Sequence, residues 1–567
     1  MLNTLTRNSL AIAVIGALSG GAQAFVVNET FSGNWGEGAG NRGLIIDVLP
    51  TSSTRPANDF SNDALVQWFT YRNGEPVWLI SNRAEIDKNT NTAELTFFEF
   101  AGGTFGPRPD IGNPTSSEWG SGTLSFTSCR TASLSFEGID GVGTLELSPA
   151  GGAVNPLCVV DEPFTACPEF AQGIPDQPGF CVISGNIEED VTLTNETQWL
   201  LSGQVNVDNG ATLTIEPGTE ITGFPDDTVD FLVVRRNARI FAEGTPSAPI
   251  IMRGFESTDR AEWGGLTING NAPINGCAEG TELCEAEGEG DSGFFGGNDP
   301  LDSSGRIRYL VVANAGFAFS PTNELNGIAL QGVGAGTVFE YVQVHLAEDD
   351  AFEPFGGTVN MRNLVATGAA DDSFDWVLGY SGNVQYVVVK QYDDSADRGI
   401  EADNFNASQD SEPRSNPTLA NFTIIGSEAS TQGVLLRRGT AGQLANFVVT
   451  GSAGVCVDID NDSTWTQAQQ ENLLAQNSVA DGCAGGTFDD RDFAVSSWWS
   501  DAGNLVADPL LGGPNGTLLQ SGSPAIGIGV VPFADAFFDK VDYAGAFAPG
   551  APDWTAGWTV GLDRKNP

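Results

Sequence analysis

The strongest constraint on the fold is a repeat in the middle of the chain. The pair Asp349–Asp350 returns as Asp371–Asp372 and again as Asp393–Asp394, and the two intervals are equal. Between these pairs, β-branched and aromatic residues recur, with Gly and Asp at the breaks. A period of roughly 20 to 25 residues with this composition is typical of a parallel β-solenoid, in which each repeat forms one coil. We call this pattern the Asp repeat.

Coil stacking predicts which side chains become neighbours. Equivalent residues of successive coils lie about 4.8 Å apart, the spacing of paired strands. The three Asp pairs are therefore expected to form one column. Glu353, Asp375 and Asp397, which recur at the same interval, are expected to form a second column beside it. The same register aligns Leu364 with Tyr386 in the apolar core.

The two columns carry an electrostatic consequence. Two ionised carboxylates roughly 5 Å apart repel each other by about 3 kcal/mol at an effective dielectric constant near 20. Protonation, exposure to water or a bound cation can offset this repulsion, and oxygen-rich clusters favour a hard cation such as Ca²⁺. In the alternative interpretation, each Asp pair only forms a turn and hydrogen-bonds its own backbone. The expected Ca²⁺ ligands are Asp349, Asp350, Asp371, Asp372, Asp393, Asp394, Glu353, Asp375 and Asp397.

The N-terminus has the pattern of a secretory signal peptide. Arg7 precedes an apolar run over residues 10–18, and the small residues that follow end at Ala22-Gln23-Ala24. This pattern predicts a signal peptide over residues 1–24. No later apolar run is long enough to span a bilayer, so we expect an exported protein without a transmembrane segment.

The charge balance narrows the class of partner. The chain carries 73 acidic and 25 basic residues, for a formal net charge of −48. Such a surface repels nucleic acids and anionic lipids, so neither is expected as a direct partner. Acidity of this degree suits a salty or calcium-bearing medium, where cations screen the self-repulsion.

The eight cysteines fall into close neighbours along the chain. An even number of cysteines in an exported protein predicts disulfides. Pairing between neighbours fits a solenoid, whose contacts are mostly local, although the spacing alone leaves the connectivity open. His345 is the one histidine, so a zinc site with several His ligands is excluded. The neighbouring pairs are Cys129 with Cys158, Cys167 with Cys181, Cys277 with Cys284, and Cys456 with Cys483.

Residues 25–158 are expected to form a small antiparallel β domain. Short apolar and alternating runs follow one another, and the segment Arg72–Glu75 is a hairpin signal. The order of Trp68–Tyr71, then Asn73–Pro76 and Trp78, resembles an uncharacterised β domain that is common in exported proteins of proteobacteria. The resemblance implies a secreted, cell-surface or periplasmic location in a Gram-negative bacterium. Residues 159–184 are then expected to be a disulfide-bearing linker.

The rest of the chain carries further marks of the solenoid. The segments Glu216–Thr219, Ala242–Thr245 and Ala248–Ile250, with Ala507–Leu510 and Ser523–Gly527 later in the chain, resemble right-handed parallel β-helix proteins, the architecture of pectate lyases and of many surface proteins. The family often has Asp where this chain has Gly527. The resemblance implies an all-β fold with a right-handed parallel β-helix over residues 185–530.

Three later segments carry separate predictions. The acidic, glycine-rich insertion at residues 276–301 is either a recognition lid or an inert loop. Residues 463–476 have the pattern of a helix. The aromatic residues of the C-terminal part, with residues 531–567 as a cap or tail, can cover the end of the solenoid. Alternatively, Trp498 and Trp499 can stack on sugar rings.

Two classes of function remain. The first is a non-catalytic surface protein that binds Ca²⁺ and docks to an extracellular glycan or to an outer-membrane protein. The second is a polysaccharide-cleaving enzyme. The resemblance to β-helix lyases implies that Asp371, Asp393, Asp394 and Asp397 would hold Ca²⁺ against a uronate, while Arg398 or Lys390 removes the C5 proton. A glycosidase that uses two facing carboxylates is a further possibility.

Overall fold

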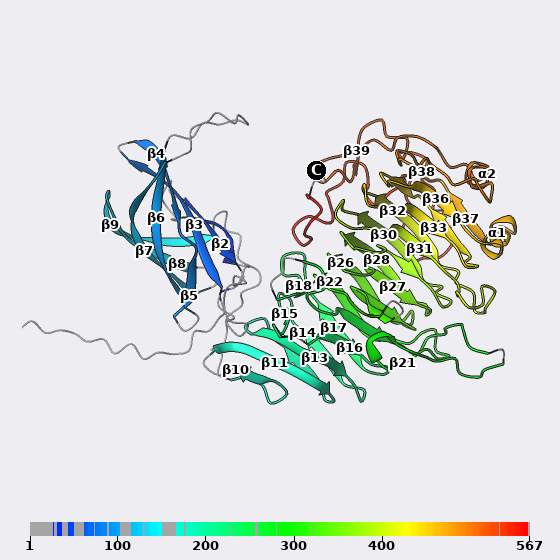
Figure 1. Cartoon of the computed structure of the whole chain (residues 1–567), viewed down its shortest axis with the longest axis horizontal. Coiled ribbons are helices and arrows are strands. Elements are labelled where there is room, and N and C mark those ends of the chain that lie inside the picture. The colour runs from blue at the N-terminus through cyan, green and yellow to red at the C-terminus, as the bar shows by residue number, and fades with distance from the viewer. Residues whose placement is uncertain are drawn as a thin grey trace, which may run out of the picture.

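The computed structural model contains two regions with separate hydrophobic cores, and strands dominate both (Figure 1). The expected signal peptide and the Cys129–Cys158 pair lie outside the described residues. The structure describes residues 166–564 apart from 175–176, 227, 256–258, 279, 321–322 and 532, and before them residues 27, 31–36, 43–49, 62–72, 74–87, 90–101, 115–128 and 131–149.

The N-terminal region is an antiparallel sheet, as predicted. The predicted hairpin joins β3 to β4, with Arg72 opposite Glu75. Pairing of β2 with β3 closes the sheet on itself, and Trp68 packs edge-on against Phe97 and Trp119 inside it. The strands are β1 (Gly33–Gly36), β2 (Gly43–Leu49), β3 (Asp63–Arg72), β4 (Glu75–Ser81), β5 (Ala84–Asp87), β6 (Thr92–Ala101), β7 (Thr115–Ser128), β8 (Thr131–Gly138) and β9 (Gly141–Pro149).

The second region is the predicted right-handed parallel β-helix. From β11 onward the strands pair in parallel with strands one coil later, whereas β10 pairs antiparallel with β11, and the coils enclose one continuous apolar core. The strands of its large sheet are β10 (Gln172–Ile174), β11 (Gln177–Ile187), β12 (Val191–Leu193), β13 (Gln198–Val207), β14 (Thr212–Ile215), β15 (Glu220–Gly223), β16 (Phe231–Val234), β17 (Arg239–Glu243), β18 (Ile250–Arg253), β19 (Leu266–Asn269), β22 (Gly305–Ala313), β25 (Ile328–Gln331), β26 (Val338–His345), β27 (Phe352–Phe355), β28 (Asn360–Thr367), β30 (Asn383–Lys390), β32 (Thr418–Ile425), β34 (Gly442–Ala445), β35 (Val448–Thr450), β37 (Leu473–Gln476) and β38 (Val479–Ala480).

One face of the β-helix carries most of the predicted cation ligands. It runs from β16 through β19, β25 and β27. It continues through β29 (Asp375–Trp376), β31 (Arg398–Ala402), β33 (Gln432–Leu436) and β36 (Val455–Ile459). Because side chains alternate along a strand, the residues between the core residues of these strands point outward. We call this surface the acidic face.

The register of the Asp repeat holds for one coil and then shifts. Val342 pairs with Leu364, as predicted, but Leu364 pairs with Val387. The prediction that Leu364 stacks on Tyr386 is wrong because Tyr386 lies at the bend between two faces. Its φ is +66°, and Asn363 has a φ of +58° at the equivalent bend one coil earlier. The coil that follows Asn363 is therefore longer than the repeat by a single residue.

Disulfides connect cysteines that are close neighbours along the chain. The predicted bridges Cys167–Cys181, Cys277–Cys284 and Cys456–Cys483 are confirmed. Such bridges fit an extracellular or periplasmic protein. The first bridge lies in the expected linker, where parallel pairing already begins at Phe180, a few residues before the predicted start of the β-helix. In the part of the chain that the structure describes, no helix has the length and apolar character needed to cross a membrane.

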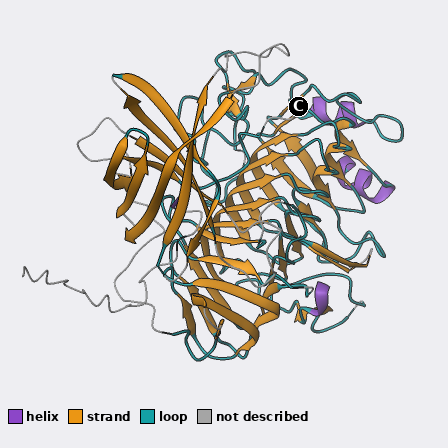
Figure 2. Ribbon diagram, turned by 60° about the vertical axis from the view of Figure 1, so that its left-hand side comes forward, coloured by secondary structure: helices purple, strands orange, loops and turns teal. Residues whose placement is uncertain are grey.

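Short helices lie near the C-terminal coils (Figure 2). The helix predicted over residues 463–476 ends early, because α1 spans Asp462–Gln469, a turn follows, and β37 covers Leu473–Gln476. A further helix, α2 (Val495–Asp501), was not predicted. The smaller pairs of strands are β20 (Ala286–Glu287) with β21 (Phe294–Phe295), β23 (Phe317–Ser320) with β24 (Asn323–Leu325), and β39 (Leu511–Gly512) with β40 (Leu518–Leu519).

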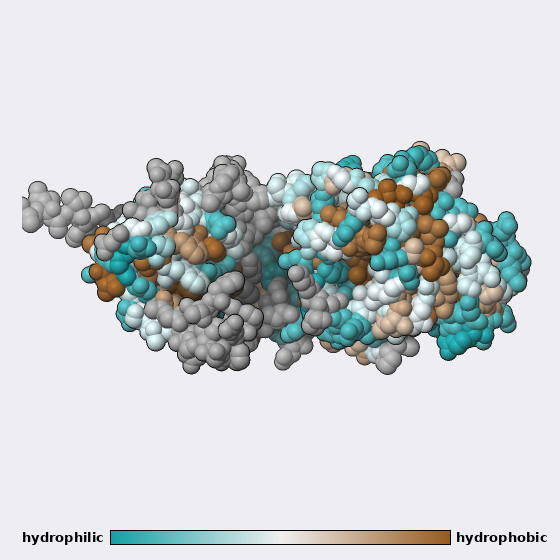
Figure 3. Space-filling model, turned by 90° about the horizontal axis from the view of Figure 1, so that it is seen from above, coloured by the Kyte–Doolittle hydropathy of each residue, from teal (hydrophilic) through white to brown (hydrophobic). Residues whose placement is uncertain are grey.

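The C-terminal tail lies along the side of the β-helix. Trp558 packs edge-on against Tyr309 and Tyr341, which lie on β22 and β26. Tail residues also pack around His345, which is half-buried. Brown hydrophobic areas remain among the teal hydrophilic ones in the view from above (Figure 3). The part of the tail around Trp558 therefore covers a lateral face of the β-helix instead of the end of the solenoid.

Candidate functional site

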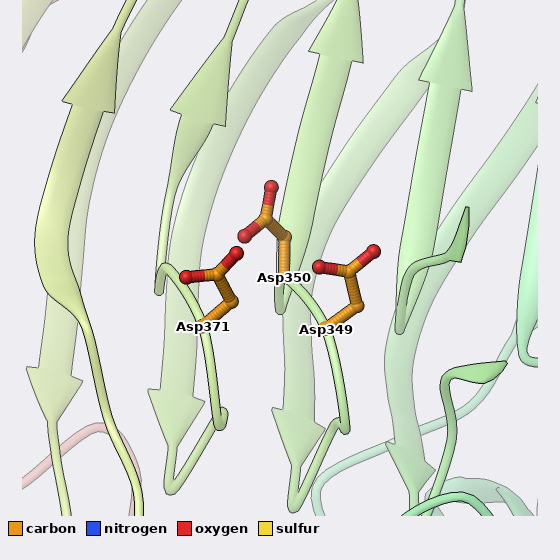
Figure 4. A group of neighbouring side chains, drawn as sticks. All are labelled: Asp349, Asp350 and Asp371. Atoms are coloured by element: carbon orange, nitrogen blue, oxygen red, sulfur yellow. The ribbon is translucent and has the colours of Figure 1, made fainter. Parts of the chain in front are cut away.

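The first two Asp pairs lie at equivalent turns of adjacent coils. Asp349 and Asp350 precede β27, and Asp371 and Asp372 precede β29 (Figure 4). Oδ1 of Asp350 accepts a hydrogen bond of 2.9 Å from the backbone N–H of Asp372. Oδ1 of Asp372 accepts one of 2.7 Å from the N–H of Arg398 in the following coil. The buried member of each pair therefore links its coil to the next, while Asp349 and Asp371 stay half-buried beside it.

These carboxylates belong to one continuous row. Each group in the row contains three side chains with carboxylate oxygens within 4.8 Å of one another. The groups share members, so the row extends over adjacent coils, and Figure 4 shows one of them. At such separations, ionised pairs repel by about 3 kcal/mol each at an effective dielectric constant near 20. The groups are Asp349, Asp350 and Asp371; Asp350, Glu353 and Asp375; Asp371, Asp372 and Asp397; and Asp372, Asp375 and Glu401.

The third Asp pair is not part of this row, so the predicted column of three pairs is wrong. Asp393 and Asp394 lie in a tight turn closed by the bridge between Tyr392 and Ser395. Asp394 makes ion pairs with Arg260 at 3.2 Å and with Arg564 at 3.3 Å. The turn adds residues that the two earlier coils lack and moves this pair out of register.

The second predicted column is correct for its first two members and wrong for its third. Glu353 and Asp375 lie in adjacent coils and in the same carboxylate group. Asp375, however, pairs in register with Glu401, which lies further along the chain than the Asp repeat predicts. Asp397 instead lies beside Asp371 and donates its backbone N–H to the carbonyl oxygen of that residue at 3.0 Å. The additional residues of the preceding turn cause both changes.

One end of the row contains its own counter-charges. Arg398 contacts Oε1 of Glu401 at 2.8 Å and also pairs with Asp397. Arg437 pairs with Glu401 and donates from Nε to Oδ1 of Asp403 at 2.9 Å. Arg438 donates from Nη1 to Oδ2 of Asp403 at 2.6 Å. We call this set the arginine-paired end, and its members are Asp397, Arg398, Glu401, Asp403, Arg437 and Arg438.

The opposite end contains acids without counter-charges. We call Glu289, Asp349, Asp350 and Glu353 the acid-only end. Among the described residues, no Arg or Lys makes an ion pair with any of the four. The amide of Asn326 lies between two of them, because its Nδ2 donates to Oε2 of Glu353 at 2.7 Å and to Oε2 of Glu289 at 3.3 Å.

The lack of counter-charge changes the proton affinity of these acids. Burial raises the pKa of Glu289 to about 8, and the charges of Asp349 and Glu324 add to the effect. Burial, with Glu324 and Asp371, raises the pKa of Asp349 to about 7. Burial and neighbouring carboxylates also hold the pKa of Glu353 well above its usual value. Near neutral pH the acid-only end therefore holds protons unless a cation replaces them.

Two buried oxygens in the row have neither a hydrogen-bond nor an ion-pair partner among the described residues. They are Oδ1 of Asp375 and Oδ1 of Asn326, which belong to residues that are 8% and 2% exposed. Buried polar atoms are nearly always paired, so such atoms point to an ion, a water molecule or a strained contact. Carboxylate and amide oxygens are ligands that Ca²⁺ accepts. The row therefore has the donor chemistry of a hard-cation site.

The other predicted site residues lie in different surroundings. Lys390 donates from Nζ to the carbonyl oxygen of Asn515 at 3.1 Å and is partly covered by the tail, so it lies away from the row. Trp499 is 2% exposed, and its Nε1 donates to the carbonyl oxygen of Leu505 at 3.3 Å. Trp498 is half-buried, and its Nε1 donates to the carbonyl oxygen of Leu473 at 3.1 Å. The packing of both tryptophans at the C-terminal coils fits the covering role.

The sequence pattern did not identify several members of the site. Glu401, Asp403, Arg437 and Arg438 do not follow the interval of the Asp repeat, and no local signal marks them. For Glu289 the one sequence signal is its position in the acidic insertion at residues 276–301. The repeat alone could not place it next to Asp349.

A comparison with protein families supports the type of fold. A family model described as a pectate-lyase-like beta helix domain matches residues 185–490. Two solved structures of the catalytic domain of a GH87 alpha-1,3-glucanase, both in complex with nigerose, share 10% identity with the chain. Each match covers 81% of this chain and 89% of the other, with TM-scores of 0.30 and 0.28. A search of curated proteins gives no match. The TM-scores are too low to bear on activity.

Proposed function

The chain belongs to the pectate-lyase-like β-helix domain family, and from this premise we propose that it binds an extracellular glycan through Ca²⁺ held by the acidic row. In this proposal it is exported by residues 1–24 and acts as a non-catalytic binding protein outside the cytoplasm. Nothing among the described residues favours a protein partner in the outer membrane over a glycan.

The observation that carries the proposal is the uneven distribution of arginine along the row. Carboxylates within 4.8 Å of one another continue past the last Arg, up to Glu353 and Asp349. Described arginines neutralise one end, and among the described residues no basic side chain pairs with the acids of the other end. A hard cation supplies that charge, and unlike a proton it also offers coordination positions to a ligand.

The arrangement gives a glycan access to such an ion. Asp350, Asp372 and Asp375 are buried, whereas Asp349, Asp371 and Asp397 are half-buried at the rim of the row. Ca²⁺ takes six to eight oxygen ligands. Rim carboxylates would leave some of these positions to sugar hydroxyl or carboxylate groups. The ion would also offset the repulsion between an acidic protein and an acidic glycan.

The lyase alternative lacks a free base among the side chains proposed for it. Arg398 is engaged with Asp397 and Glu401, and it lies 3.7 Å from Asp372. Lys390 is engaged with the C-terminal tail. Neither side chain is available to remove a proton from a sugar at the row.

A glycoside hydrolase is the second candidate, because one observation favours it. Asp349 and Asp371 come from adjacent coils, and the pKa of Asp349 is raised to about 7. A carboxyl that holds its proton near neutral pH, next to a second carboxyl, can protonate a leaving group. In that case Asp349→Asn would abolish the release of reducing ends from a neutral or acidic polysaccharide.

The direct test uses the purified mature chain with a panel of glycans that includes neutral glucans and polyuronates. We expect Ca²⁺ to raise the melting temperature, and we expect at least one glycan to bind in Ca²⁺ and to dissociate in EDTA. Mg²⁺ at the same concentration is the control for ionic strength. A melting temperature that does not respond to Ca²⁺, together with glycan binding that EDTA leaves unchanged, would overturn the proposal.

A further inference from the structure

The insertion at residues 276–301 places an acid at the acid-only end of the row. Its short helix, η3 (Glu289–Asp291), places Glu289 beside Asn326, which lies between β24 and β25. The backbone N–H of Gly290 donates to Oδ1 of Asn323 at 2.7 Å, and Oγ of Ser292 donates to Oε1 of Gln331 at 3.2 Å. The insertion is therefore docked on the acidic face through specific polar contacts.

Apolar contacts and a disulfide hold the rest of the insertion. The ring of Phe295 packs edge-on against Phe355, with centroids 6.3 Å apart. The Cys277–Cys284 bridge closes a loop at the start of the insertion. These contacts bring the insertion to the β-helix but do not account for the charge that Glu289 carries with it.

Electrostatics between the insertion and the acidic face oppose docking. Nδ2 of Asn326 contacts Oε2 of Glu289 at 3.3 Å and Oε2 of Glu353 at 2.7 Å, so the two carboxylates share one amide nitrogen and repel each other when both are ionised. Like charges at such short range destabilise the contact between the two segments. The docked position therefore requires a compensating positive charge when these acids are ionised.

A separate observation points to the same place. Oδ1 of Asn326 is buried and has no partner among the described residues, although Nδ2 of the same amide contacts both Glu289 and Glu353. An amide oxygen beside two carboxylates is a normal part of the oxygen set around Ca²⁺. The geometry thus offers one neutral and at least two anionic ligands from three different segments.

We propose that the insertion is a cation-dependent lid, in which Glu289, Glu353 and Oδ1 of Asn326 share one Ca²⁺ that clamps the insertion onto the acidic face. This inference rests on the proposed function, because it uses the cation that the row binds. It adds that the cation controls access to the glycan site by ordering residues 286–295. Chelation releases these residues from the β-helix, while the disulfide keeps the start of the loop in place.

The test is hydrogen–deuterium exchange of the full mature chain in Ca²⁺ and in EDTA, with Ca²⁺ alone as the probe. In the wild type, we expect Ca²⁺ to slow exchange over residues 286–295 by about tenfold or more, since local opening sets the exchange rate. Glu289→Gln removes the charge at nearly constant shape, so this dependence on Ca²⁺ should disappear. Glu287→Gln is the matched control, because Glu287 is exposed on the same insertion, and it should behave like the wild type.

Melting temperatures give a second readout that a purely structural role of Glu289 would not produce. In EDTA at a pH above about 8, where Glu289 is ionised, Glu289→Gln should melt above the wild type, because a repelling charge is gone. In Ca²⁺ it should melt below the wild type, because a ligand is gone. If Ca²⁺ binds the wild type but leaves exchange of the insertion unchanged, the lid is refuted and the proposed function stands. If Ca²⁺ does not bind the wild type, both proposals are refuted.

Discussion

The two ends of the acidic row belong to the same fold and differ in their source of positive charge. At the arginine-paired end, Glu401 and Asp403 contact Arg437, which arrives from the next coil. At the acid-only end, Asp349 and Glu353 are also crowded by other carboxylates, but no described basic side chain pairs with them. The arginine-paired end can be rigid without a ligand, whereas the acid-only end changes its charge with pH and with cations.

This difference assigns separate roles to similar residues. A buried ion pair is costly to break, because removal of one partner leaves an uncompensated charge. A crowded acid without a partner has the opposite behaviour, since its removal relieves repulsion. Mutations at the two ends should therefore change stability in opposite directions.

The largest change in stability, a loss, is expected when Arg437 is replaced by Met. Glu401 and Asp403, with side chains 7% and 3% exposed, would lose a shared counter-charge, at a cost of about 3 kcal/mol. Ca²⁺ should restore part of this loss, because the mutation makes this end resemble the acid-only end. Thermal melts in EDTA and in Ca²⁺ provide the measurement.

The control for this variant is Arg491→Met. Arg491 is 84% exposed and pairs with Asp489. Exposed pairs contribute little, so its melting temperature should stay unchanged. If Arg437→Met in EDTA melts like the wild type, the two ends do not differ in the way we describe.

A smaller change in stability, this time a gain, is expected for Glu353→Gln. The amide keeps an oxygen for the hydrogen bond from Nδ2 of Asn326 and removes one charge from the crowded end. At alkaline pH in EDTA, the variant should be more stable by about 1 kcal/mol, part of the repulsion between close carboxylates. Its Ca²⁺ affinity, measured by calorimetry, should fall by about tenfold. A variant less stable than the wild type in EDTA would contradict this assignment.

The pH dependence of stability should also differ with and without the cation. The folded-state pKa values of Asp349 and Glu289, about 7 and about 8, lie above their ordinary values of 3.8 and 4.5. The folded chain therefore binds more protons than the unfolded chain between about pH 4 and pH 8, and its stability falls as pH rises through this window.

We expect the melting temperature in EDTA to fall by about 2 °C or more across that window because of these two groups. The double variant Asp349→Asn, Glu289→Gln should lose this component, so it serves as the control. In Ca²⁺ the fall should be smaller, because protons and the cation compete for the same oxygens and Ca²⁺ binds more tightly as pH rises. A double variant with the same pH profile as the wild type would assign the dependence to other groups.

The smallest changes in stability and in Ca²⁺ affinity are expected for Asp394→Asn. Asp394 lies outside the row and pairs with Arg260 and Arg564, with a side chain 43% exposed. Its replacement should cost at most about 1 kcal/mol and leave the Ca²⁺ affinity unchanged. Asp371→Asn is the matched comparison, because the Asp repeat alone does not distinguish the acidic pairs of successive coils. Equal loss of Ca²⁺ affinity in both variants would favour the sequence-based column over the observed row.

The repeat was sufficient to predict the β-helix and the first part of the row. Asp350 above Asp372, and Glu353 above Asp375, follow from coils of constant length. The sequence could not predict Glu401, because the coil that joins it to Asp375 is longer than the repeat and contains an additional turn. Strand pairing tolerates such turns, so the period changes while the stacking continues.

The Asp repeat also could not predict contacts between segments that lie far apart in the sequence. Glu289 reaches Asp349 from an insertion between β19 and β22, and its place depends on contacts such as that between Phe295 and Phe355. The tail was expected at the end of the solenoid because of its aromatic residues. Those aromatic residues instead pack on Tyr309 and Tyr341 along the side, a surface whose tyrosines come together only once the coils are built.

The most direct test of the central claim is anomalous X-ray diffraction from crystals of the mature chain grown with Ca²⁺ or with Tb³⁺ in its place. We expect an anomalous peak at the acid-only end, about 2.3 to 2.6 Å from oxygens that include those of Glu289 or Glu353, and no peak at the arginine-paired end. No peak along the row, or a peak confined to the arginine-paired end, would contradict it.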